Sequence, residues 1–116
     1  MRALVDPFVR CVDYLRLSVT DRCNLRCVYC MPAAGMRQAA PEDLMSDDEI
    51  VRIVSAAVRL GARHVRLTGG EPLVRPGIAG LVSRLARVQD LEDLSLSTNG
   101  MGLASLAEDL LRSGAR

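Results

Sequence analysis

Strand-like and helix-like segments alternate along this chain, and that alternation restricts the fold more than any other feature. Residues 14–19, 63–68 and 93–98 alternate apolar and polar side chains, as half-buried strands do. Each is followed by a segment with apolar residues at helical spacing; these segments begin near residues 47, 77 and 103. Serial strand–helix units place neighbouring strands parallel, because a parallel neighbour needs a crossover connection. The sequence therefore predicts an α/β fold with three serial βα units and a parallel sheet.

Each predicted strand also carries a polar face. It is formed by Arg16 and Ser18, by His64, Arg66 and Thr68, and by Ser95 and Ser97. The interior of a closed barrel is normally filled by Val, Ile and Leu, so a polar interior favours a wider or open barrel that holds a ligand. Two inward arginines would suit a polyanion such as a phosphate chain. The same pattern also fits a solvated sheet face with structural ion pairs, and strand periodicity leaves both interpretations open.

Cys23, Cys27 and Cys30 follow the first predicted strand with the spacing C-x3-C-x2-C. Three thiols so close in sequence can bind one metal centre. A four-iron cluster normally takes four thiolates, so three leave one iron available to a substrate or cofactor. The spacing therefore favours a reactive iron–sulfur cluster over one that only transfers electrons.

Other interpretations of the cysteines account for less of the pattern. A structural zinc site needs four ligands, and the remaining candidates by type, Cys11 and His64, do not form a second knuckle. A redox pair at Cys27 and Cys30 would leave the third thiol without a role. Cys11 lies outside the motif, and we expect it to be a small buried apolar residue.

Composition disfavours several functional classes. The net charge of +1 gives no global electrostatic case for binding nucleic acid or membrane surfaces. Trp is absent and there is one Phe, which argues against an aromatic platform for stacking bases. Residues 1–20 mix charged with apolar residues and do not resemble a secretory signal, so we expect the reducing cytoplasm and no structural disulfides.

Two further motifs follow the other predicted strands. Residues 69–72 read Gly-Gly-Glu-Pro and residues 97–100 read Ser-Thr-Asn-Gly. With the cysteine segment they would meet where strands of α/β barrels end and sites form. Tyr29 supplies an aromatic residue directly before Cys30, and in this combination the chain resembles the radical S-adenosylmethionine (SAM) superfamily. The flanking residues 14–32, 65–75 and 96–100 resemble in particular the GTP 3′,8-cyclase (MoaA) family of molybdenum cofactor biosynthesis.

This resemblance implies a fold and an activity. The fold would be the N-terminal half of a partial (β/α) TIM-type barrel of the radical SAM kind. The activity would be conversion of GTP, through a 5′-deoxyadenosyl radical, to a cyclised precursor of cyclic pyranopterin monophosphate. The implied cofactors are a [4Fe-4S] cluster and SAM. The implied partners are GTP as substrate and a flavodoxin- or ferredoxin-like electron donor, and a homodimer is compatible with the family.

Position by position, the resemblance also implies residue roles. Cys23, Cys27 and Cys30 would ligate the [4Fe-4S] cluster. Tyr29 would lie against the adenine side of SAM, and Gly70 would contact its methionine end. The positions that match the GTP site are Arg16, Arg66 and Ser97. No catalytic side chain is assigned, because the cofactor would supply the chemistry.

The chain departs from the family pattern in sequence and in length. Ser97 replaces the usual Thr and keeps the hydroxyl, while Val9 replaces a Gly. His64 stands where Lys is common, and we expect a strand histidine with a local hydrogen bond. The sequence stops where a fourth strand would begin, so we expect residues 1–116 to be the N-terminal half of a radical SAM core and to be inactive alone. The alternatives are a radical SAM enzyme with another substrate, or a non-catalytic iron–sulfur or metal-binding module.

Overall fold

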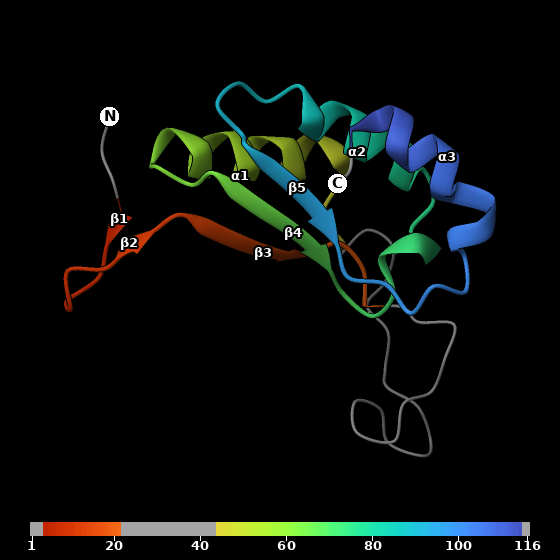
Figure 1. The fold of residues 1–116 in the computed structure, drawn as a ribbon, viewed down its shortest axis with the longest axis horizontal. Coiled ribbons are helices and arrows are strands. Elements are labelled where there is room, and N and C mark those ends of the chain that lie inside the picture. Colours follow the sequence, from red (N-terminus) through yellow and green to blue (C-terminus); the bar gives the residue numbers. More distant parts are fainter. Residues whose placement is uncertain (1–3, 22–43, 115–116) are drawn as a thin grey trace, which may run out of the picture.

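The computed structural model describes residues 4–21 and 44–114, and within them it confirms the predicted alternation of strands and helices (Figure 1). The elements are β1 (Leu4–Val5), β2 (Cys11–Val12), β3 (Tyr14–Ser18), α1 (Asp47–Arg59), β4 (His64–Thr68), the 3₁₀ helix η2 (Pro72–Val74), α2 (Ile78–Ala86), β5 (Asp93–Leu96) and α3 (Leu103–Ser113).

The main sheet has three parallel strands in the order β3-β4-β5. Chain order and spatial order are the same, so both crossovers advance in one direction. The helices accordingly lie on one face of the sheet, as Figure 1 shows. A doubly wound fold would reverse direction and place helices on both faces. The arrangement is that of consecutive units of a (β/α) barrel and agrees with a partial radical SAM fold.

The core lies between this sheet and its helices. Side chains of β4 and β5 pack against the apolar stripes of α1 and α2; the fully buried members include Ile50, Val54, Val65, Leu67, Leu81, Val82 and Leu85. The predicted stripe of α3 is only partly covered, because Leu110 is buried while Leu103 and Leu111 are exposed. An apolar groove remains between α3 and β5; its lining includes Leu73, Leu96, Leu103, Leu110 and Leu111.

The start of α1, predicted near residue 47, is confirmed. The Glu49 backbone N–H donates to Ser46 Oγ at 3.2 Å, and the Ser46 N–H donates to Glu49 Oε1 at 3.4 Å. This reciprocal pair is a capping box, which satisfies N–H groups that have no partner inside the helix. Gly61, with φ of 113°, follows the helix in a conformation that favours glycine.

A two-stranded hairpin that the sequence did not predict precedes the sheet. Strands β1 and β2 pair antiparallel and project beyond the sheet in Figure 1. Cys11 lies on β2 and is exposed, so the expectation of a buried residue there was wrong. The physical reason is that, among the described residues, no helix covers this hairpin as the helices cover the main sheet.

The hairpin turn is organised by Asp6. Its Oδ1 accepts the backbone N–H groups of Phe8 at 2.8 Å and Arg10 at 2.9 Å, and its Oδ2 accepts Arg10 Nε at 2.6 Å. The bond from the Arg10 backbone is the main cause that holds the pKa of Asp6 below its ordinary value. Within this turn Val9 has φ of 64°, a left-handed conformation that a β-branched residue rarely adopts.

Val9→Gly is therefore expected to stabilise the hairpin. Relieving the left-handed strain gains about 1–2 kcal/mol, and the freedom of Gly in the unfolded chain returns part of it, which leaves about 1 kcal/mol. Amide exchange across β1 and β2 should slow by about fivefold. Val12→Gly, in a strand, is the matched control and should speed exchange. Unchanged or faster exchange in Val9→Gly would show that Val9 is unstrained in solution.

Candidate functional site

The three motif-bearing segments leave the sheet side by side. Beyond the ends of the strands, the parallel pairing continues through three backbone bonds: Val19 N to Thr68 O at 3.0 Å, Gly70 N to Thr20 O at 2.9 Å, and Ser97 N to Leu67 O at 3.0 Å. The arrows of β3, β4 and β5 point to this common edge in Figure 1. The Gly-Gly-Glu-Pro and Ser-Thr-Asn-Gly motifs therefore lie together at the carboxyl ends of the strands, as predicted. Val19 and Thr20, which precede the cysteine motif in sequence, lie beside them, and the cysteines themselves are outside the described residues.

Gly69 allows the closest of these approaches. Its φ is 142°, and a Cβ built on it would lie 2.3 Å from the Thr20 carbonyl oxygen and 3.3 Å from Ser18 Oγ. Only glycine fits there, because any side chain would overlap the backbone that leads from β3 toward the cysteines. The Gly-Gly pair therefore sets the spacing between the first and second motif segments.

Glu71 joins the second motif to the third. Its side chain is 1% exposed, and it accepts the Thr98 hydroxyl on Oε2 at 2.7 Å and the Asn99 backbone N–H on Oε1 at 3.0 Å. A buried carboxylate with two such bonds fixes both segments, because a buried polar group left without partners would be costly. Sequence reasoning assigned no role to Glu71, although a lone acid between Gly70 and Pro72 was a visible signal.

The polar face of the sheet is formed as predicted. Arg16 lies opposite Arg66, which lies opposite Ser95, so the three residues form one row across β3, β4 and β5. Leu15 and Leu17 alternate with them and pack against the core on the other face. Register thus brings the two arginines together on the face that the described helices leave uncovered.

Arg66 has unused hydrogen-bonding capacity. Its Nη1 donates to Ser97 Oγ at 3.4 Å, a long contact. Its Nε and the Ser95 hydroxyl are buried and have no hydrogen-bond partner among the described residues. Buried donors without partners are rare in folded proteins, so these groups are suited to a ligand with several acceptor oxygens.

The alternative of a structural ion-pair network receives no support from this face. Among the described residues, neither Arg16 nor Arg66 has a carboxylate within ion-pair distance, although five other basic side chains do. Uncompensated arginines at neighbouring positions repel each other, and an anionic ligand would relieve that repulsion.

Of the predicted site residues not yet placed, Gly70 is described and four are not. Cys23, Cys27, Tyr29 and Cys30 lie outside the described residues. Gly70 lies at the common edge, and its N–H is already donated to Thr20, so a ligand would meet its carbonyl or Cα instead.

Among the described residues, His64 has no partner for the local side-chain hydrogen bond expected of it. Its Nε2 lies 3.9 Å from Asp13 Oδ2, which is too long for a hydrogen bond, and its ring stacks on Tyr14 with centroids 6.2 Å apart. Both contacts are at the amino end of β4. This end is opposite to the motif segments, so His64 is not part of the candidate site.

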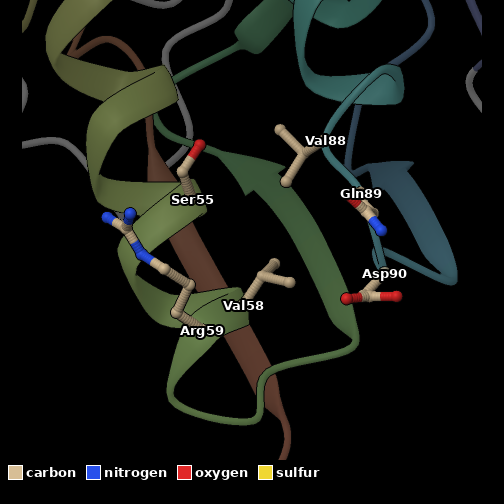
Figure 2. Close-up of a pocket in the computed structure, with 6 residues that line it drawn as sticks. All are labelled: Ser55, Val58, Arg59, Val88, Gln89 and Asp90. Carbon is tan, nitrogen blue, oxygen red and sulfur yellow. The ribbon is translucent and has the colours of Figure 1, made fainter.

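A cavity of about 340 Å³ also lies at the amino ends of the strands, between the end of α1 and the segment before β5 (Figure 2). Its lining residues are Ser55, Val58, Arg59, Val88, Gln89 and Asp90. None of the motif residues reaches it, and it combines one acid and one base over two valines. The cavity is therefore separate from the candidate site.

No helix in residues 4–21 and 44–114 combines the length and apolar character needed to cross a membrane.

The sequence matches the model of one protein family and resembles several enzymes that share one name. The model of the radical SAM superfamily matches residues 17–116. A GTP 3′,8-cyclase of Geobacter sulfurreducens is 50% identical over 113 residues, which is 97% of this chain and 35% of the relative. The enzyme of that name from Streptomyces coelicolor is 51% identical over 112 residues, 96% of this chain and 33% of the relative. The chain thus spans about a third of the length of these relatives. The matched residues contain all three motif segments, and the chain belongs to the radical SAM superfamily.

Proposed function

We propose that this chain is the N-terminal part of a GTP 3′,8-cyclase, an enzyme of molybdenum cofactor biosynthesis. Support comes from the superfamily assignment and from relatives of that name at about half identity. The observation that carries the choice of substrate is the row of Arg16 and Arg66. It lies on the sheet face opposite the described helices, beside the motif edge, and has no ion-pair partners among the described residues. A triphosphate is the part of GTP that such a row would bind.

The three thiols of Cys23, Cys27 and Cys30 form a donor set that fits a [4Fe-4S] cluster with one open iron. The described residues give a second reason to propose the cluster next to the GTP site. The segment that carries the thiols follows Thr20, which lies directly beside Gly69 and Gly70. Its first residues therefore start at the edge where the sheet presents Arg66 and Ser97. When bound, the cluster and SAM supply electron transfer and the radical chemistry.

The residues of the chain then bind, orient and shield. Tyr29 and Gly70 are proposed to hold SAM, and Arg16, Arg66 and Ser97 to hold GTP. Guanidinium groups bind phosphate oxygens through paired N–H donors, and the buried Nε of Arg66 is available for such a pair. Ser97, already in contact with Arg66, would orient the guanidinium or contact GTP directly. Correct placement matters, because a misplacement of about 1 Å can cost roughly 100-fold in rate.

The experiment that tests this function uses the full-length protein, purified and reconstituted without oxygen. It should be brown, with absorption near about 400 nm from thiolate-bound iron and sulfide. With SAM, a reductant and GTP it should form cyclised GTP. A brown protein that cleaves SAM but ignores GTP would be a radical SAM enzyme with another substrate. A colourless protein with stoichiometric zinc would be a metal-binding module.

Arg66→Leu in that protein is expected to weaken GTP binding by about tenfold or more, because a charge-assisted bond contributes roughly 1.5–3 kcal/mol. Iron content should stay unchanged. Titration of GTP by calorimetry and an iron assay check the two halves of the expectation. Arg52→Leu, on the exposed side of α1, controls for loss of charge alone. Equal GTP affinity in Arg66→Leu and wild type would remove Arg66 from the substrate site.

A further inference from the structure

One arginine that no sequence motif singled out joins three separate parts of the chain. Arg75 Nη1 donates to the Val19 carbonyl at 2.6 Å, and its Nη2 donates to the Met45 carbonyl at 2.8 Å. The same Nη2 lies 2.8 Å from Asp47 Oδ1. The Arg75 side chain is 11% exposed, so these bonds form largely away from water.

Two of these acceptors flank the segment that carries the cysteines. Val19 is the first residue after β3, and Met45 directly precedes the Ser46 cap of α1. Adjacent nitrogens of one planar guanidinium therefore hold the carbonyl before the segment and the carbonyl after it. A planar, rigid fork fixes both carbonyls relative to each other, which a single flexible charge would not do.

Each acceptor is itself held in place by the fold. Val19 is fixed to β4 through its N–H bond to Thr68 O. Met45 packs against the core, next to the capping box. Asp47 lies in the first turn of α1 and supplies the counter-charge for the guanidinium. Arg75 follows η2 directly, so the Gly-Gly-Glu-Pro segment that approaches Thr20 also positions the arginine.

From this geometry we infer that Arg75 is a positioning residue that fixes the two ends of the cysteine-bearing segment relative to the sheet edge. Its functional meaning rests on the proposed cluster role of that segment. The inference itself concerns only the bridge among Val19, Met45 and Asp47. With the ends fixed, less conformational entropy remains to be lost when three thiols converge on one metal centre.

The test compares Arg75→Met with Arg84→Met in the full-length protein. Arg84 is the matched control, because its Nη2 pairs with Asp48 Oδ1 at 2.7 Å in the same turn of α1 but contacts neither end of the segment. By sequence, the trypsin sites within the segment are Arg22, Arg26 and Arg37, and the digestion uses metal-free protein. Exposed Arg87, after α2, serves as the internal reference for general unfolding.

Arg75→Met is expected to speed cleavage within the segment by about tenfold relative to cleavage after Arg87, since bonds to a charged group are lost. Arg84→Met should leave that ratio unchanged. Arg75→Lys keeps the charge without the fork, and we expect it to raise the ratio by about threefold. In reconstituted protein, the visible absorption of Arg75→Met should bleach faster with a chelator than that of Arg84→Met.

Several results would overturn the inference. An unchanged cleavage ratio in Arg75→Met would show that the bridge does not hold the segment. Equal acceleration after Arg87 would show that Arg75 only supports general stability. Wild-type behaviour of Arg75→Lys would show that charge alone suffices. A wild-type protein that never binds a cluster would refute the proposed function instead, and the proteolysis comparison would still decide the role of Arg75.

Discussion

If the proposed cluster site is correct, replacing Cys23, Cys27 or Cys30 singly by Ala in the full-length protein is expected to remove most of the iron that the reconstituted protein takes up. Loss even of a residue that only supports a metal ligand costs roughly 10–100-fold in metal affinity, so loss of a ligand should cost at least about tenfold. With three thiolates the centre has no spare ligand. Iron and sulfide assays after anaerobic reconstitution, together with the visible absorption, measure the effect.

Cys11→Ala is the matched control. The Cys11 thiol is exposed on β2, in the hairpin that projects beyond the sheet. Its removal should leave iron content and absorption as in wild type. Iron loss in Cys11→Ala equal to that in the motif variants would make Cys11 a fourth ligand and would refute the open-iron interpretation.

Gly69→Ala is expected to destabilise the fold more than the addition of a methyl group at any other glycine in the described part of the chain. The backbone there has φ of 142°, and the new Cβ would lie 2.3 Å from the Thr20 carbonyl oxygen. The conformation alone costs an alanine roughly 1–3 kcal/mol. The overlap is with backbone, which cannot rotate away, so we expect a total loss of about 3 kcal/mol or more in the free energy of unfolding. Denaturant unfolding of the full-length protein measures it.

Gly80→Ala provides the contrast for that experiment. Gly80 lies within α2, and a Cβ there would meet nothing within 4 Å. Since Gly in a helix interior costs roughly 0.5–1 kcal/mol relative to Ala, this variant should be slightly more stable than wild type. If Gly69→Ala unfolds at the same denaturant concentration as Gly80→Ala, then β3 and β4 do not approach as closely in solution as the contact at Thr20 requires.

The main sheet was predictable because its strands bury one face. Leu15, Val65 and Leu94 alternate with polar neighbours, and the observed register places them on the same side. The same parity predicts that Arg16 and Arg66 face the same side of neighbouring strands, as the register shows. The hairpin of β1 and β2 was missed, since two-residue strands carry no measurable period and its turn has Val9 where a glycine would have signalled it.

The contacts that shape the site edge were not predictable by the same reasoning. Glu71 meets Thr98 across 27 positions of sequence, and Arg75 meets Val19 across 56. Periodicity reports only which face of its own element a residue occupies. It contains no information on which distant oxygen a guanidinium or carboxylate will meet. The apolar stripe of α3 shows the same limit. Its spacing predicts a buried helix face, but of the described α3 residues only Leu110 is buried.

The sequence separation of the Arg75 contacts sets an order of events during synthesis. Val19 and Met45 leave the ribosome 56 and 30 residues before the arginine that joins them. At about 5–20 residues per second, the thiols are synthesised some seconds before Arg75 can fix the ends of their segment. We therefore expect metal to enter only after the second strand–helix unit has emerged. Nascent chains stalled before Arg75 should then take up less iron than chains stalled after α2. Arg75, which is synthesised after the thiols, would thus set the time at which their segment can bind metal.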